Sequence, residues 1–268
     1  MQLNQRVIYG KQFKTIGFIL TMSLIMAFSF PGLLKASNLE DRLAKLEAKL
    51  EIELEKTRAL NEIANLIAKN QYYQWARMHD ERIDLFAMKT PGVKAEIEQF
   101  GIYDGPEGIK KMLNMEKLAN GEGVGQMVAN LLTTPVITVA GDGKTAKGVW
   151  LSPGITADAT SDGEENFSWR WIRIGADFIK EGGQWKIWHY HLYGWFNIPF
   201  YKSSSEAGVT GGPGREGGGP TMPAEMQSLM PDRPNSYSWS YSTKSQTENV
   251  PAPPEPYDTW DDSMSYVK

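Results

Sequence analysis

The chain has 268 residues, a formal net charge of −4 and no cysteine. The absence of cysteine excludes disulfides, thiolate catalysis and cysteine-ligated metal sites, and a net-acidic chain is poorly suited to binding nucleic acid. This length accommodates one large domain or two small ones.

The N-terminal 36 residues have the pattern of an export signal. Three basic residues precede an uncharged apolar stretch at residues 16–30, and Ala36 offers a small residue for cleavage. Basic, apolar and small-residue segments in this order are typical of a secretory signal, although an uncleaved stretch of this length could also anchor the chain in a bilayer. We therefore expect residues 1–36 to be a signal peptide or membrane anchor, and the protein to be exported (periplasmic, extracellular or membrane-anchored).

Residues 37–62 predict a charged amphipathic helix. Glutamate and lysine are interspersed there with leucines spaced three to four residues apart: Leu39, Leu43, Leu46, Leu50 and Leu54. Such spacing places apolar side chains on one stripe of a helix. The stripe is short for a stable coiled coil, so the helix is either a spacer that docks on the domain or an oligomerisation segment.

The next part of the chain predicts helices first and strands afterwards. A second helical pattern runs from Ile63 to Phe86, and Pro106 begins a short helix through Leu118. Residues 101–105 predict a turn. Strands are predicted at residues 93–100, 135–140, 145–151, 169–180 and 185–193. This order indicates an α+β domain, which we assign to residues 63–202.

Residues 203–268 form a different kind of segment. They are rich in glycine and proline and lack periodicity, which predicts an irregular C-terminal extension. Several tyrosines and tryptophans in this extension are costly to leave in water, so we expect part of it to wrap over the domain.

Several motifs in residues 63–200 resemble, by their order and spacing, the SnoaL-like domain of the NTF2-like (nuclear transport factor 2-like) superfamily. They are YYQWARMHD at 72–80, IDLF at 83–86, GIYDGPEGI at 101–109, TPVI at 134–137, AGD at 140–142, ADF at 176–178 and GQWKI at 183–187. The resemblance implies a cone-shaped α+β fold, in which N-terminal helices cover a curved, mostly antiparallel sheet around a pocket. It does not imply one reaction, since the superfamily includes dehydratases, isomerases, cyclases, dehydrohalogenases and non-enzymatic binding modules.

Two of the three histidines lie in one predicted strand. Alternation along this strand puts His189, His191 and Tyr193 on a single face, which we expect to point toward the covering helices. A two-residue turn before the strand would pair His189 with Ala176 and His191 with Ile174, so that the cross-strand neighbours would be apolar. Imidazoles in such surroundings stay neutral, as a general base must be. The alternative is a pair of core histidines satisfied by tyrosine or backbone groups.

Asp80 and Tyr73 are the partners that the resemblance implies for a catalytic histidine, because related enzymes supply a tyrosine and an aspartate from this neighbourhood. Asp80 lies seven residues after Tyr73 and returns to the same face of a helix. A carboxylate held there would orient an imidazole and stabilise its protonated form. His79 is a candidate for substrate binding. The alternatives are a solvated helix end, and Asp84 in place of Asp80.

One predicted pocket position departs from the resemblance. Many relatives carry a histidine four residues before the position of Thr134, and here that residue is Asn130. Asparagine can donate a hydrogen bond to an oxyanion but cannot exchange a proton near neutral pH. Aromatic side chains suggest the walls of a pocket for a flat hydrophobic ligand, or a subunit interface. The substrate-binding candidates among them are Trp150, Trp169, Trp171 and Tyr193.

These residues favour a cofactor-independent lyase or isomerase, of the dehydratase type, acting on a small hydrophobic or aromatic molecule. His189 or His191 would remove a proton and Asp80 would orient the imidazole. Tyr73 or Tyr193, together with Asn130, would stabilise the developing oxyanion or assist a leaving hydroxyl. The alternative function is a non-catalytic small-molecule-binding or assembly protein of the same fold. We expect no cofactor and no metal, although two histidines two residues apart in a strand do occur in metal sites.

The other face of the histidine strand favours self-association. Trp188, Tyr190 and Leu192 alternate with the histidines, on a face that the covering helices should not reach. Burying this apolar face would stabilise a homodimer or homotrimer by about 25 cal/mol per Å².

Overall fold

The structure is a computed structural model, and it describes most of the chain. The described residues are 6–98, 100–119, 124–159, 165–200, 224–237, 244 and 246–268, with the backbone alone for residues 6–37, 119, 158–159 and 165–166. The chain divides into two compact units, Met1–Glu55 and Lys56–Lys268. The side chains of the predicted export signal, residues 1–36, lie outside the described part. Among the described side chains, no helix is both long and apolar enough to cross a membrane.

The first unit consists of helix. α1 spans Arg6–Trp75, so the helix predicted at residues 37–62 is confirmed. The leucines of its stripe are about half exposed in the single chain: Leu39, Leu43, Leu46, Leu50 and Leu54. Pairing of this stripe with a second copy stays a prediction.

The second unit contains the remaining elements, with the sheet formed by seven strands. The helical elements are the end of α1, α2 (His79–Arg82), η1 (Ile83–Leu85), α3 (Gly105–Ala119), α5 (Ala224–Gln227) and η2 (Asp262–Met264). The strands are β1 (Lys94–Ile97), β2 (Gly101–Asp104), β3 (Met127–Asn130), β4 (Thr133–Val139), β5 (Thr145–Ala159), β6 (Glu165–Glu181) and β7 (Gln184–Pro199).

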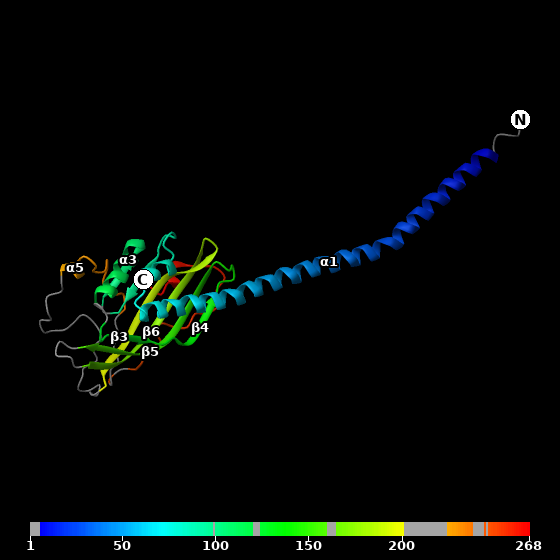
Figure 1. Cartoon of the computed structure of the whole chain (residues 1–268). Coiled ribbons are helices and arrows are strands. Elements are labelled where there is room, and N and C mark those ends of the chain that lie inside the picture. The colour runs from blue at the N-terminus through cyan, green and yellow to red at the C-terminus, as the bar shows by residue number, and fades with distance from the viewer. Residues whose placement is uncertain are drawn as a thin grey trace. The chain divides into compact units, whose positions relative to one another are not determined.

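The sheet is mixed but mostly antiparallel. Its order is β2-β1-β7-β6-β5-β3, β4 also pairs with β5, and β1 and β7 are the parallel pair. Strands β3 to β6 are labelled in Figure 1. One apolar core lies between the sheet and two helices, and it includes Ile63 and Ile67 of α1, Ile109 of α3 and Ile174 of β6. The prediction of an α+β fold with N-terminal helices over a curved, mostly antiparallel sheet is confirmed.

Two local predictions are wrong. The helical pattern expected to run on to Phe86 is interrupted after Trp75, where Arg77 takes a left-handed conformation with φ of 61°. The turn expected at residues 101–105 is instead strand β2, which pairs with β1 and forms a bridge from Ile102 to Arg233. All four residues of β2 pair with the neighbouring β1, and the bridge to Arg233 adds a second contact about 130 residues later in the chain.

A bulge in β7 reverses the predicted direction of the two histidines. Ile187 pairs with Phe178, but His189 pairs with Asp177, so Trp188 is an extra residue in β7. One extra residue shifts the alternation of faces along a strand. Ile187 therefore faces the core, whereas His189 and the side chains that alternate with it lie on the opposite face of the sheet.

The bulge overturns three predictions together. The cross-strand neighbours of His189 and His191 are Asp177 and Gly175, and not the apolar Ala176 and Ile174. The histidines do not face the covering helices. Trp188, Tyr190 and Leu192 were expected to form an exposed apolar face that drives self-association. Tyr190 and Leu192 are instead buried in the core beside the helices, so they are not available to a second copy.

The C-terminal extension covers the face of the sheet that carries the histidines. Ser265 and Val267 are buried, and the extension forms backbone hydrogen bonds such as Gly141 N–H to the Tyr257 carbonyl at 2.8 Å. The wrapping expected from its aromatic residues is therefore found in the described part. The sheet is covered by helices on one face and by the extension on the other.

Candidate functional site

The outer face of the sheet carries a buried network centred on Asp177. The Asp177 side chain is fully buried and lies 2.7 Å from the Lys147 ammonium and 2.9 Å from His189 Nδ1. The backbone N–H of Tyr266 donates to the same carboxylate at 3.0 Å. Asp177 is thus the carboxylate partner that was predicted for a histidine, in place of Asp80.

The arrangement around His189 is not that of a nucleophilic relay. Ser265 Oγ lies 3.1 Å from His189 Nδ1, the same ring nitrogen that contacts Asp177. A relay needs the carboxylate on one ring nitrogen and the nucleophile on the other. The network therefore ties strands β5, β6 and β7 to the extension.

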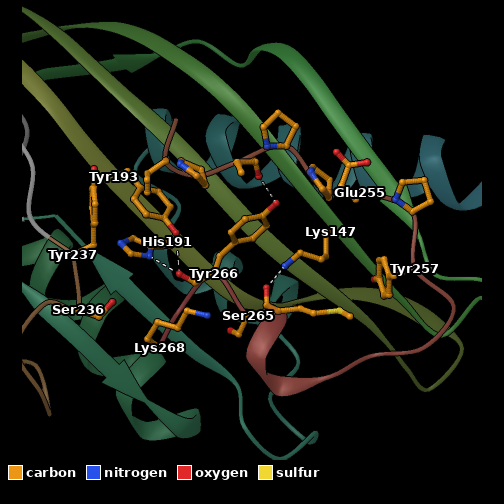
Figure 2. A pocket seen from close by; sticks show the side chains of 17 residues that line it. Lys147, His191, Tyr193, Ser236, Tyr237, Glu255, Tyr257, Ser265, Tyr266 and Lys268 are labelled. Carbon is orange, nitrogen blue, oxygen red and sulfur yellow. Dashed lines mark hydrogen bonds between the residues drawn. The ribbon is translucent and has the colours of Figure 1, made fainter. Parts of the chain in front are cut away.

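His191 is also held by the extension. Its Nδ1 donates to the Tyr266 carbonyl at 2.7 Å, and the Tyr193 hydroxyl donates to the same oxygen at 2.9 Å (Figure 2). Burial lowers the pKa of His191 to about 3, although this hydrogen bond and the charge of Asp177 raise it in part. A base this weak is poorly matched to proton abstraction near neutral pH.

Asp80 is far too exposed to be the orienting carboxylate. Its side chain is 77% exposed and lies 3.4 Å from the ammonium of Lys117, while both histidines of β7 are buried against other partners. The predicted dyad of Asp80 with His189 or His191 is therefore wrong. Tyr73 is half-buried and packs against the apolar core.

His79 belongs to a buried polar cluster that sequence reasoning missed. Arg82 is fully buried, forms an ion pair with Glu116, and donates from Nε to Asn70 Oδ1 at 3.1 Å. His79 Nδ1 lies 4.0 Å from Glu116, and neither ring nitrogen has a hydrogen-bond partner among the residues that the structure describes. Burial lowers the pKa of His79 despite the nearby Glu116 charge, so this imidazole is neutral at pH 7. The residues come from three helical elements, and no local pattern joins them.

The three tryptophans predicted to line a pocket have different surroundings. Trp150 is a core residue in edge contact with Phe178 at 6.2 Å. Trp169 is 52% exposed and lies against Phe200, and Trp171 contacts Trp195 with its Nε1 buried and unpartnered. Trp169 and Trp171 share a face of β6, but none of the three tryptophans is among the residues that line the α1–β3 cavity.

A cavity of about 470 Å³ lies between the last turns of α1 and strands β3 and β4, and we call it the α1–β3 cavity. It is lined by Ala68, Gln71, Tyr72, Trp75, Ala129, Asn130, Leu131, Leu132 and Thr133. Of the predicted site residues, only Asn130 is among them. Tyr72 is the one ionisable side chain in this lining.

Two unpaired amide groups distinguish the α1–β3 cavity. Gln71 is 8% exposed, and its Nε2 is buried with no hydrogen-bond partner among the described residues. Asn130 Oδ1 is buried and unpartnered as well. A buried donor or acceptor without a partner costs about 1–3 kcal/mol, so such atoms point to a group that is bound there in the working protein. Gln71 was missed because a glutamine in a helix carries no signal of its own.

Gln71→Leu should stabilise the protein without a ligand. Removing an unpaired buried donor should raise the free energy of unfolding by about 1–3 kcal/mol. The matched control is Gln74→Leu in the next turn, because Gln74 donates to Glu116 at 3.4 Å and its loss should destabilise. Chemical denaturation of both variants measures the difference. Equal destabilisation by the two substitutions would contradict the assignment.

Comparisons with known proteins identify the family of this chain. No match was found among curated proteins. One similar solved structure is a putative scytalone dehydratase from Novosphingobium aromaticivorans, with 13% identity over 58% of this chain and 95% of that chain and a TM-score of 0.45. Another is a type 2 hexachlorocyclohexane dehydrochlorinase, LinA, with 14% identity over 56% and 95% and a TM-score of 0.45. A putative NTF2-like dehydratase from Streptomyces avermitilis has 14% identity over 52% and 97% and a TM-score of 0.44. A family model described as SnoaL-like domain matches residues 55–191, just over half of the chain, and the chain therefore belongs to the SnoaL-like domain family.

Proposed function

We propose that this protein binds a small, uncharged and largely apolar molecule in the α1–β3 cavity. The observation that carries the proposal is the unpaired amide pair, Gln71 and Asn130, in a cavity otherwise lined mainly by apolar groups. Its volume of about 470 Å³ lies in the range of small-molecule sites. Gln71 Nε2 is the donor and Asn130 Oδ1 the acceptor of the proposed site. Both atoms are buried in the empty protein, Asn130 Oδ1 against Gly154, and they turn toward the ligand when it binds. A ligand with a neighbouring carbonyl and N–H group, such as a carboxamide or lactam, complements both.

The side chains that line the α1–β3 cavity favour binding of a ligand without proton transfer. Among the described residues that line the cavity there is no histidine, carboxylate or lysine, and general acid–base catalysis needs a group that exchanges protons near neutral pH. Asn130 lies where relatives carry a pocket histidine, and an amide cannot take that role. The binding protein is therefore favoured over the cofactor-independent lyase or isomerase.

One observation keeps the lyase or isomerase as a second candidate. His79 is buried and neutral, lies near Glu116, and has two unpartnered ring nitrogens. A ligand that reached His79 would meet a neutral imidazole, which can act as a base, beside the Glu116 carboxylate. The α1–β3 cavity does not include His79, so this candidate needs a path that opens when the ligand binds.

Calorimetric titration with naphthalene-2-carboxamide and naphthalene tests the proposal. The carboxamide should bind more tightly than the hydrocarbon, and Gln71→Leu or Asn130→Leu should each reduce its affinity by about 2- to 10-fold, the effect of one neutral hydrogen bond. Naphthalene binding should not weaken in either variant. Asp80→Asn is the control and should leave both affinities unchanged.

Two outcomes would count against the proposal. Equal binding of the two probes, or a carboxamide affinity that ignores both leucine substitutions, would contradict a role for the amide pair. A loss of binding in His79→Gln, with Gln71→Leu unaffected, would move the site to the His79 cluster and favour the lyase or isomerase.

We also propose that residues 1–36 direct export. Mass spectrometry of the native protein should find a mature chain that begins near Ser37, or the full chain in the membrane fraction. A soluble, full-length product in the cytoplasm would contradict this.

A further inference from the structure

A second cavity, of about 520 Å³, lies on the opposite face of the sheet, under the C-terminal extension (Figure 2). Lys147, His191 and Tyr193 of the sheet form one wall. Residues 236–237, 250–257, 264–266 and 268 of the extension form the other. We call it the extension cavity. None of its lining residues belongs to the α1–β3 cavity.

The walls of the extension cavity are fixed by hydrogen bonds. The Tyr266 hydroxyl donates to the Ala252 carbonyl at 3.1 Å, and Thr145 and Tyr257 share a hydrogen bond at 3.2 Å. Gly175 lies directly beneath the Tyr266 ring, where a Cβ atom would be 2.9 Å from Cγ of that ring. The cavity is therefore preformed, which reduces the entropy lost on binding.

Most polar groups of the lining already have partners within the protein. The hydroxyl groups of its tyrosines are all engaged: Tyr193 to Tyr266, Tyr237 to Glu248, Tyr257 to Thr145 and Tyr266 to Ala252. The Lys147 ammonium contacts Asp177, the Met264 carbonyl and the Tyr266 ring. The tyrosines and four prolines thus offer mainly ring faces to a ligand.

Two lining residues are exceptions: Glu255, whose side chain is exposed, and His191, which is buried. The His191 side chain is 3% exposed, and Nδ1 is occupied by the Tyr266 carbonyl. No hydrogen bond to Nε2 is found in the described part of the chain, and in Figure 2 this nitrogen faces away from Tyr266. A carbonyl can only accept, so Nδ1 carries the proton and Nε2 carries a lone pair. The nearby Glu96 oxygen, 3.5 Å from Nδ1, favours the same tautomer.

We propose that the extension cavity binds a phenol, with the aromatic ring among the tyrosine and proline side chains and the hydroxyl donating to His191 Nε2. A carboxylate would bring only acceptors to this lone pair. An ammonium group would enter a cavity whose lining holds two lysines, Lys147 and Lys268, against one glutamate, Glu255. A phenol is neutral, and its hydroxyl can donate a hydrogen bond to the lone pair of Nε2. The source is either a free phenol or the tyrosine side chain of a peptide, and the proposal is independent of the function proposed above.

Nitrogen-15 NMR of the imidazoles tests this directly, because the protein has only three histidines. On titration with 4-ethylphenol, the Nε2 resonance of His191 should shift, while those of His79 and His189 stay in place. 4-Ethylanisole has no hydroxyl proton, so it should leave Nε2 unshifted and bind about 2- to 10-fold more weakly. N-acetyl-tyrosinamide is the peptide arm, and tighter binding than 4-ethylphenol would identify a tyrosine side chain as the source.

Two variants separate the extension cavity from the α1–β3 cavity. Ala252→Trp fills the extension cavity and should abolish the shift, whereas Gln71→Leu should leave it intact. The proposal is overturned if neither phenol moves His191 Nε2, if 4-ethylanisole moves it equally, or if the shift survives in folded Ala252→Trp. Should Ala252→Trp not fold, the comparison of 4-ethylphenol with 4-ethylanisole on the unmodified chain decides.

Discussion

Asp177→Asn should lower the free energy of unfolding by about 3–5 kcal/mol, the loss expected when one partner of a buried ion pair is removed. The Lys147 side chain is 8% exposed, and its ammonium lies 2.7 Å from the fully buried Asp177 carboxylate. Asparagine keeps the shape of the side chain and an acceptor for His189 and Tyr266. It leaves the Lys147 charge buried without a counter-charge. Urea denaturation followed by circular dichroism measures the loss.

Two further variants separate charge from shape. Lys147→Met combined with Asp177→Asn removes both charges and should recover most of the lost stability, because an apolar replacement of a buried pair is often neutral. Asp80→Asn removes an exposed carboxylate and should change stability by less than about 1 kcal/mol. If the double variant is as unstable as Asp177→Asn alone, the effect does not come from the unpaired charge.

Acid should destabilise the protein, with His191 as a main cause. The folded pKa of His191 is about 3, below its ordinary value of 6.5, so the unfolded chain takes up the proton first. This contribution is fully present above pH 6.5 and is lost as the pH falls toward 3, by at most about 5 kcal/mol at about 1.4 kcal/mol per pH unit. The lowered pKa of His79 acts in the same direction, and the raised pKa of buried Glu96 acts in the opposite one.

The control for the acid effect is His191→Gln, which cannot take up a proton. The groups that face His191 remain in that variant, namely Glu96, Tyr193 and the Tyr266 carbonyl. Unfolding free energies measured between pH 7 and pH 4 should fall less steeply in His191→Gln than in the unmodified protein. Identical slopes would show that His191 does not titrate as its burial requires.

The sequence predicted the fold class because the local patterns are strong. Apolar periodicity predicted helix over residues 63–75 of α1 but not where it ends, Pro106 indicated the start of α3, and glycines indicated the hairpin between β6 and β7. Strand β2 was missed although its main partner, β1, is only four to ten residues away, because its glycines and Asp104 resemble a turn and its bridge to Arg233 is distant in the chain.

The direction of the histidines was mispredicted for a specific reason. Alternation assumes a regular strand, and the extra residue Trp188 breaks it. The Trp188 indole donates to the Pro91 carbonyl at 2.9 Å and stacks near Trp260 at 5.1 Å, so residues from two other parts of the chain hold the bulge. No pattern within residues 185–193 contains that information.

The candidate site was predicted only in part. The resemblance to relatives located Asn130, which lines the α1–β3 cavity. Gln71 and the buried Arg82–Glu116 pair were not found, because their burial follows from packing between helices and not from residue type. Asp177 was missed as a partner of His189 because the predicted register was one residue out.

A crystal structure with bound naphthalene-2-carboxamide tests the central claim most directly. The account predicts electron density in the α1–β3 cavity, with the ligand carbonyl accepting from Gln71 Nε2 and the ligand N–H donating to Asn130 Oδ1, both at about 2.9 Å. The ring should lie against Trp75 and Leu132. Density beside His79 and Glu116, or an α1–β3 cavity that stays empty of ligand at saturating concentration, would contradict it.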